Sequence, residues 1–197
     1  MAKKSYKVSF KTPIGELMWV NISKDGADQS MAKDGSKMQK VATIVLEGEK
    51  KEQVLNELQQ IWEGFKTELN LKKGTAAKSL GWRAEKDKET DEETGRITLT
   101  FKCNAKLPDG RESIVKVLNA KGQEVNLGER AIGNGSQGVI HGEAAYYDAN
   151  GTKGVTLYLK AIQLTKFVEY QMNVNAEDLS DEGSFQGIDD ADNVIPF

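Results

Sequence analysis

Short segments in which apolar and polar residues alternate make up most of the chain. Tyr6, Val8 and Phe10 alternate with polar neighbours, and the same pattern runs through residues 97–104. Alternation with a period of two predicts strands with one buried face. Residues 41–46 instead form a nearly continuous apolar run rich in β-branched side chains, which also favours a strand. The further strand candidates are residues 17–22, 114–118, 139–147 and 155–164.

Polar segments with glycine separate these strand candidates. Residues 24–40 contain Asp-Gly twice and are expected to form a long loop, and residues 72–95 form a second long, charged connection. Residues 148–151, Asp-Ala-Asn-Gly, lie between two strand candidates and predict a hairpin turn.

One segment has the periodicity of a helix. Apolar residues recur at spacings of three and four over residues 49–69, and the opposite face is Lys, Glu and Gln. The apolar positions are Val54, Leu55, Leu58, Ile61, Trp62, Phe65 and Leu69. We expect this helix to lie across a sheet as a lid, with Trp62 in the core.

Many short strands with one amphipathic helix predict a mainly β protein built as a small closed or partly closed barrel. Among such barrels the OB-fold, a five-stranded Greek-key barrel, is the one whose open face commonly binds oligonucleotides. We therefore expect an OB-fold with extra strands and loops over residues 1–172 and a flexible acidic tail over residues 173–197.

The charge distribution separates the tail from the body. The formal net charge is −3, but residues 176–197 hold seven acids and no Lys or Arg, so residues 1–175 carry +4. Such a chain can bind a polyanion through its body and a basic partner through its tail. The tip has acids at Asp189, Asp190 and Asp192 and ends in Ile195-Pro196-Phe197. The terminal ring and carboxylate suit a pocket with an apolar floor and a basic rim, so we expect the tip to bind partner proteins.

Composition excludes several other classes of protein. A single Cys and a single His exclude an internal disulfide framework and argue against a zinc site, and no cofactor or metal is implied. The first residues lack the apolar segment of a signal peptide, and no apolar run is long enough to cross a bilayer. We expect a non-enzymatic protein of the cytoplasm without membrane contact.

Three segments resemble phage-encoded single-stranded DNA-binding proteins with an OB core. They are Trp19-Val20-Asn21, residues 132–136 (Ile-Gly-Asn-Gly-Ser) and residues 154–164 (Gly-Val-Thr-Leu-Tyr-Leu-Lys-Ala-Ile-Gln-Leu). The acidic tip ending in Ile-Pro-Phe is similar to that of bacterial single-stranded DNA-binding proteins. The resemblance implies an OB-fold that coats single-stranded DNA and a tail that recruits replication and repair enzymes.

Single-strand binding without sequence readout needs cations for the phosphates and rings on which bases stack. Thr156, Tyr158 and Lys160 share the polar face of one strand, and we expect Tyr147 to lie across the hairpin from Tyr158 as a stacking platform. The DNA-binding candidates are Trp82, Arg83, Lys102, Lys106, Arg111, Tyr147, Tyr158 and Lys160. Trp82 fits equally well as a ring that stacks on a base and as an anchor of its loop. Trp19 lies two residues after Leu17 and so shares its face of the strand, which favours a position in the core.

The leading hypothesis is a sequence-nonspecific single-stranded DNA-binding protein for phage DNA replication, recombination and repair. An RNA-binding OB module would share the stacking face, and a metal-dependent nuclease would use the carboxylates. A protein-binding adaptor would act through the tail alone. The sequence leaves homo-oligomer formation open.

Overall fold

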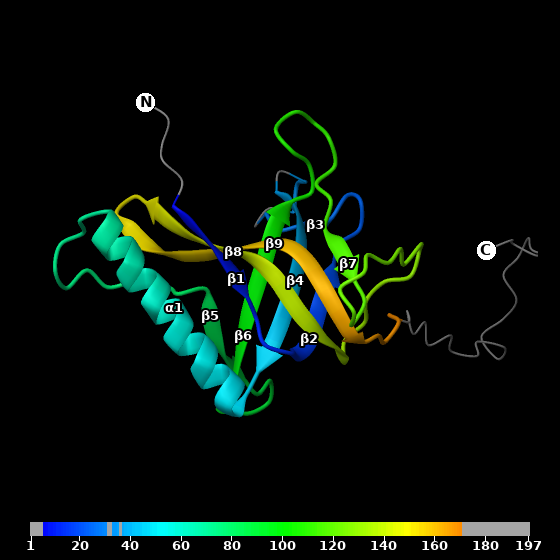
Figure 1. The fold of residues 1–197 in the computed structure, drawn as a ribbon, viewed down its shortest axis with the longest axis horizontal. Coiled ribbons are helices and arrows are strands. Elements are labelled where there is room, and N and C mark those ends of the chain that lie inside the picture. The colour runs from blue at the N-terminus through cyan, green and yellow to red at the C-terminus, as the bar shows by residue number, and fades with distance from the viewer. Residues whose placement is uncertain (1–5, 31–32, 36, 171–197) are drawn as a thin grey trace, which may run out of the picture.

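The computed structural model describes residues 6–30, 33–35 and 37–170, and within them the protein is mainly β (Figure 1). The strands are β1 (Lys7–Lys11), β2 (Gly15–Asn21), β3 (Ala27–Asp28), β4 (Met38–Leu46), β5 (Trp82–Lys86), β6 (Glu93–Asn104), β7 (Lys116–Leu118), β8 (Ser136–Ala149) and β9 (Thr152–Lys166). The helix α1 (Gly48–Glu68) follows β4.

Five of these strands close into a barrel. β8 pairs with β2, β2 with β4, β4 with β6 and β6 with β9, and β9 pairs back with β8. All of these pairings are antiparallel except β6–β9, which is parallel and joins Lys102 to Tyr158. A five-stranded barrel closed in this order confirms the predicted OB-fold. β1 adds to the barrel beside β8, and β7 adds beside β9.

Most of the alternate residues that the sequence pattern had placed inward fill the barrel interior, but Val8 of β1, expected on the buried face with Phe10, is 43 % exposed. Ile97, Leu99 and Phe101 on β6 are buried, and the Phe101 ring stacks on Phe10 of β1 with centroids 6.1 Å apart. The long strands β8 and β9 supply Ile140 and further apolar side chains to the same core.

The helix begins and ends one residue earlier than predicted and covers one end of the barrel (Figure 1). Its buried residues are Val54, Leu58, Trp62 and Phe65. The Trp62 ring stacks on Tyr146 of β8 at 6.2 Å, and Phe65 meets the same ring edge-on at 6.3 Å. The prediction that Trp62 belongs to the core is confirmed.

The predicted hairpin connects β8 and β9. Ala149 pairs with Thr152, so Asn150 and Gly151 alone form the turn, with φ of 52° and 82°. Two central residues with positive φ make the turn whose twist matches that of the strands, and Asn-Gly is the favoured sequence for it.

Two of the predicted loops contain strands. β3 lies within residues 24–40 and pairs with the start of β4, and β5 lies within residues 72–95 and pairs with β6. β3 has only two residues, too few for an alternation, and β5 (Trp-Arg-Ala-Glu-Lys) is mostly polar, so its sequence shows no apolar face of a strand. The strand predicted over residues 114–118 is shorter in the structure, where it begins at Lys116 as β7. Ile114 lies before it and is 75 % exposed.

The predicted boundary at residues 172–173 and the acidic tail lie outside the described residues. In the described part of the chain, no helix has the length and apolar character needed to span a membrane.

Candidate nucleic-acid interface

A groove runs over the outer face of β6. One hollow of about 820 Å³ lies between β6, β9 and the loop of residues 105–115, and a second of about 400 Å³ lies between β2, β3, β4 and β6. The two hollows share Thr100 and Lys102, so we treat them as one surface and call it the β6 groove. Among the described residues lining the larger hollow are Lys7, Lys37, Lys102, Lys106 and Lys160, with Glu143 as the acid.

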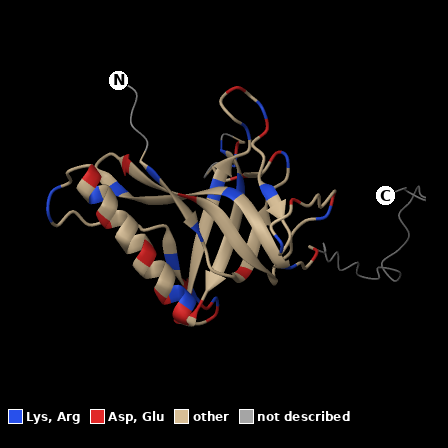
Figure 2. Cartoon of the chain, viewed as in Figure 1, with Lys and Arg blue, Asp and Glu red and all other residues tan. Residues whose placement is uncertain are grey.

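The floor of the groove follows from the alternation along β6. Because the odd-numbered residues of β6 point into the barrel, Thr100 and Lys102 point outward. Thr100 pairs with Thr43 of β4, and their hydroxyl oxygens are 3.0 Å apart. Lys102 pairs with Val41 on one side and Tyr158 on the other. Figure 2 shows blue segments gathered on the strands below the 105–115 loop.

Lys102 is the central cation of the groove. Partial burial lowers the pKa of its ammonium, and the nearby charges of Lys37 and Arg83 lower that pKa further. Its Nζ donates to the amide oxygen of Gln29 at 3.5 Å, a neutral acceptor. A cation held among other cations in a partly desolvated position is stabilised by an incoming anion such as phosphate.

Tyr158 offers an aromatic ring at one end of the groove. Its side chain lies on the outer face of β9, where the residue is 39 % exposed. Nζ of Lys7 lies 4.8 Å from the centre of the ring. Glu143, which pairs with Tyr158 across the strands, holds Lys7 at 3.4 Å and Lys160 at 3.5 Å. A base stacked on this ring would therefore have two ammonium groups close by for the adjoining phosphates.

Trp19 offers a second ring at the other end of the groove. It is 56 % exposed and lines the smaller hollow. The expectation that it belongs to the core is wrong, because Trp19 has a φ of 48° and lies where the register of β2 with β4 shifts. Such a bulge breaks the alternation of the strand and turns the side chain outward.

Cys103 also lines the groove, beside Lys102. Burial raises the pKa of its thiol, and its sulfur lies 3.9 Å from the hydroxyl of Ser113 in the 105–115 loop. Within the described residues, no group of three His, Cys, Asp or Glu side chains could hold a metal ion.

The structure brings four of the predicted DNA-binding residues together. Lys102, Lys106, Tyr158 and Lys160 all line the larger hollow. Arg83 is exposed on β5, pairs with Thr98 of β6 and lies close enough to Lys102 to lower its pKa.

The remaining predicted residues lie elsewhere. Trp82 is partly buried and packs against the core, as expected of a ring that pairs with Leu99. Arg111 lies near the tip of the 105–115 loop and pairs with Asp109 at 2.7 Å.

The predicted Tyr147–Tyr158 platform is wrong. Tyr147 pairs with Gly154, whereas Tyr158 pairs with Glu143. The two tyrosines are therefore separated by about 13 Å along the strands, at about 3.3 Å per residue. The two-residue turn at Asn150 and Gly151 sets which residues of β8 and β9 face each other, and it does not pair the two tyrosines. The sequence alone does not give this pairing.

Sequence reasoning missed Lys7, Lys37 and Trp19. Lys7 had a usable signal, since it alternates with Tyr6 and Val8 and so belongs to the polar face of its strand. Lys37 had none, because it precedes β4 in a polar loop that the fold alone brings to the groove.

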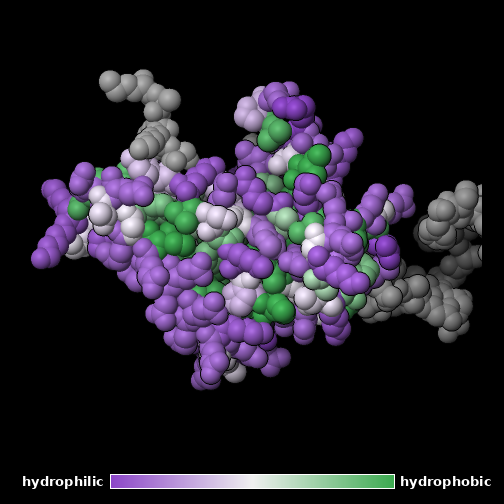
Figure 3. Space-filling view, viewed as in Figure 1, coloured by the Kyte–Doolittle hydropathy of each residue, from purple (hydrophilic) through white to green (hydrophobic). Residues whose placement is uncertain are grey.

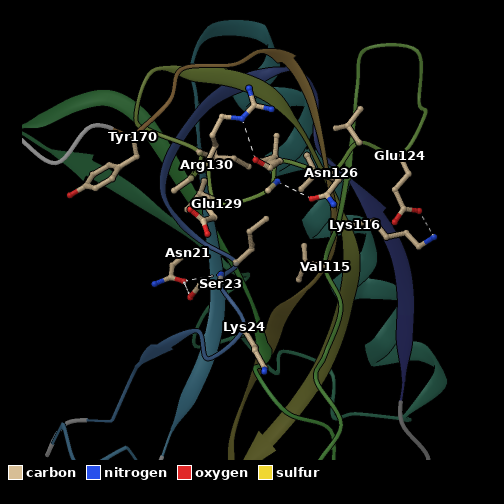
Figure 4. A pocket seen from close by; sticks show the side chains of 18 residues that line it. Asn21, Ser23, Lys24, Val115, Lys116, Glu124, Asn126, Glu129, Arg130 and Tyr170 are labelled. Atoms are coloured by element: carbon tan, nitrogen blue, oxygen red, sulfur yellow. Dashed lines mark hydrogen bonds and ion pairs between the residues drawn. The ribbon is translucent and has the colours of Figure 1, made fainter. Parts of the chain in front are cut away.

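A separate hollow of about 930 Å³ lies beside β7 (Figure 4). Its charged residues are of both signs. Lys116 pairs with Glu124 at 2.9 Å, and Glu129 and Arg130 lie on the same short segment. Arg130 donates through Nε to the carbonyl of Leu127 at 3.2 Å. This mixed lining does not favour a polyanion, in contrast to the β6 groove.

The barrel, its helix and the lysine-lined groove define an OB-fold protein with a face suited to an extended polyanion. Searches found no matching family model and no matching curated relative. Among solved structures, the chain is similar to gp2.5, a single-stranded DNA-binding protein encoded by bacteriophage T7. The TM-score is 0.58 at 16 % identity, over 93 % of this chain and 98 % of that one.

The chain is also similar to the single-stranded DNA-binding protein from bacteriophage Enc34, solved in complex with single-stranded DNA. The TM-score is 0.60 at 12 % identity, over 82 % of this chain and 88 % of that one. At these identities the likeness establishes the shared fold.

Proposed function

We propose that this protein binds single-stranded DNA without sequence preference along the β6 groove. The observation that carries the proposal is the composition of the groove, in which five lysines and one acid line the larger hollow among the described residues. Exposed rings, Trp19 and Tyr158, stand at its two ends. Lysines neutralise phosphates and rings stack on bases of any identity, so the site needs no base-specific contact.

The path of the strand follows from the order of these groups. One base stacks on Trp19 and another on Tyr158, and Lys102 lies between them for the intervening phosphates. Lys7 and Lys160 serve the phosphates beyond Tyr158, while Lys37 and Lys106 serve those along the wall of the larger hollow. Arg83 extends the cationic surface from β5 toward Lys102. Trp82, Arg111 and Tyr147 stay proposals from the sequence and would act only on DNA that extends past the groove.

Both of the solved structures described above are of phage proteins that bind single-stranded DNA, and this likeness supports the same role here. We propose that the protein is phage-encoded and coats exposed strands during DNA replication, recombination and repair in the host cytoplasm, without catalysis and without a cofactor. The acidic tip, with Asp189, Asp190, Asp192 and Ile195-Pro196-Phe197, would recruit partner enzymes. Homo-oligomer formation on the strand would be compatible with coating.

The deciding experiment is a titration of the full chain with oligothymidine at several salt concentrations, followed by tryptophan fluorescence. We expect quenching, because Trp19 is exposed in the groove, and a linear fall of log affinity with log salt. A slope of about −3 would correspond to four or five phosphate contacts at about −0.7 each for a single strand. Absence of quenching and of measurable binding would overturn the proposal and favour the adaptor.

Two further measurements test the RNA-binding module and the nuclease. Tighter binding of an RNA oligomer than of DNA of the same sequence would favour the RNA-binding module, since the 2′-hydroxyl distinguishes the two backbones. Cleavage of a labelled strand on addition of magnesium would favour the nuclease.

A further inference from the structure

Lys40 is a buried lysine in the wall of the barrel. It lies on β4, opposite Cys103 of β6, and is 2 % exposed. Its neighbours at Ala42 and Ile44 are fully buried, so the Lys40 side chain points into the barrel at its end. A buried ammonium group is strongly unfavourable unless it is paired and hydrogen-bonded.

The partner of Lys40 is Glu112, which lies in the loop between β6 and β7. Nζ of Lys40 donates to Oε1 of Glu112 at 2.6 Å. This hydrogen bond is the main reason that the pKa of Glu112 is lowered, and the charge of Lys24 makes a smaller contribution. The pair joins positions 72 residues apart, and it ties this loop to β4.

The 105–115 loop that Glu112 anchors forms one wall of the β6 groove. In Figure 1 this loop projects above the sheet, and Figure 3 shows hydrophobic residues near its base. Its groove-lining residues are Lys106, Leu107, Pro108, Ser113 and Ile114. At its base, the N–H of Ala105 donates to the carbonyl of Met38 at 3.0 Å.

Backbone hydrogen bonds fix the shape of the loop, and the bond from Ala105 to Met38 ties its base to β4. Leu107 and Ser113 donate within the loop, to Arg111 at 2.8 Å and to Ala105 at 2.9 Å. Above its base, Glu112 joins the loop to Lys40 of β4, and Ser113 joins it to Cys103 of β6. Of these two contacts the ion pair is the shorter, at 2.6 Å against 3.9 Å, and the charged one.

We propose that the Lys40–Glu112 ion pair positions the 105–115 loop for single-stranded DNA, and that Glu112 strengthens DNA binding without touching the strand. The proposal rests on the function proposed above and deepens it. Glu112 and Lys40 are positioning residues, since they act through Lys106, Leu107 and Ile114. A loop that is already held in its binding position loses less conformational entropy when DNA binds, so the affinity is higher.

The sign of the effect distinguishes this proposal from simple electrostatics. Glu112 is an acid close to a cationic groove, so charge alone predicts that its removal tightens the binding of a polyanion. Loss of the anchor predicts the opposite. The substitution Glu112→Gln keeps the size of the side chain, removes its charge and leaves Lys40 without an ionic partner.

The experiment measures oligothymidine affinity and its salt dependence for the wild type, Glu112→Gln, Lys40→Met and the double variant. We expect each single variant to bind about five- to tenfold more weakly, and the double variant to lose no more than either, because both remove the same ion pair. The salt slope should stay unchanged in Glu112→Gln, whereas Lys106→Ala should reduce it by about 0.7. Glu124→Gln, which breaks the exposed pair with Lys116, is the matched control and should bind as the wild type.

Cys103 gives a second readout that is independent of DNA. It is the single cysteine of the chain, and the loop covers it through Ser113. We expect its reaction with a thiol reagent to be several-fold faster in Glu112→Gln than in Glu124→Gln, with unchanged far-ultraviolet circular dichroism.

Equal or tighter DNA binding by Glu112→Gln, or an unchanged rate of thiol reaction, would overturn the inference. A wild type that does not bind oligothymidine would instead overturn the proposed function, and the thiol rates would still decide whether Glu112 holds the loop. If Glu112→Gln fails to fold, Lys40→Met takes its place. Equal or tighter DNA binding by Lys40→Met, or an unchanged rate of thiol reaction, would then overturn the inference.

Discussion

The backbone N–H of Trp19 donates a hydrogen bond to Oδ1 of Asn134, 2.9 Å away, across 115 positions of the chain. Trp19 has a φ of 48°, a left-handed conformation that non-glycine residues seldom adopt. Asn134 belongs to the turn before β8, where the N–H of Ser136 donates to the carbonyl of Gly133. The turn therefore holds the bulge of β2 in the conformation that exposes the indole to the groove.

Replacing Trp19 with Ala should weaken oligothymidine binding by about 1–3 kcal/mol, the usual contribution of one stacked base. Because Trp19 is the exposed indole of the groove, the same variant should lose most of the fluorescence quenching. Trp82→Phe is the comparison, since Trp82 packs against the core, and it should keep both affinity and quenching. Quenching that disappears in Trp82→Phe but persists in Trp19→Ala would assign the stacking role to β5 instead.

The sequence was sufficient for elements whose pattern is local. The helix could be predicted within one residue at each end because its apolar stripe spans the whole segment, and the β8–β9 hairpin because Asn-Gly suits positive φ at both positions. Barrel closure also followed, since many short strands with one helix leave few other architectures.

The site was predicted only in part because it depends on register and on distant pairs. Alternation correctly placed Lys102, Tyr158 and Lys160 on a solvent-facing side of their strands. For Trp19 the alternation predicted the core, but the bulge at that position turns the side chain to the opposite face. Lys40 was expected in the long loop of residues 24–40, where a lysine would be exposed, but it belongs to β4 and is buried. Only the fold brings Glu112 to it and so explains its burial.

Tyr158 should contribute through its ring and not through its hydroxyl. Tyr158→Ala should weaken oligothymidine binding by about 1–3 kcal/mol, whereas Tyr158→Phe should change affinity by less than about twofold. The measurement is the affinity of both variants at one salt concentration. Tyr147→Ala is informative in the same series, because Tyr147 lies beside Gly154 and away from the groove. A loss in Tyr147→Ala equal to that in Tyr158→Ala would mean that the strand reaches the hairpin.

DNA affinity should fall at alkaline pH through Lys102. In the free protein, burial and the charges of Lys37 and Arg83 hold the pKa of Lys102 below 10.5. A bound phosphate stabilises the ammonium and raises that pKa, so binding is linked to proton uptake. Affinity is then fully present below the pKa of the free protein and declines as the pH rises through it.

Lys102→Arg tests this assignment, because a guanidinium stays protonated throughout the range. The variant should bind as the wild type near neutral pH and lose less affinity as the pH rises toward 10.5, the ordinary lysine value. The measurement is a pH series of oligothymidine titrations at constant ionic strength. Identical alkaline losses in both proteins would assign the proton to other lysines of the groove.

The acidic tail should compete with DNA for the groove. Residues 176–197 carry seven acids and no Lys or Arg, and they are tethered to a body of charge +4. A tethered polyanion has a high effective concentration near a cationic surface, so its removal should free the lysines for phosphates. Deleting residues 176–197 should tighten oligothymidine binding several-fold at about 50 mM salt and less than about twofold at about 0.5 M, where charges are screened.

A full-length variant separates charge from length in this prediction. Asp189→Asn, Asp190→Asn and Asp192→Asn combined keep every residue of the tail and remove three of its seven acids. Binding should then tighten by an intermediate amount, with the same dependence on salt. Truncation that leaves binding unchanged or weakens it would mean that the tail does not occupy the groove. Equal tightening at both salt concentrations would point to excluded volume, since a steric effect is not screened.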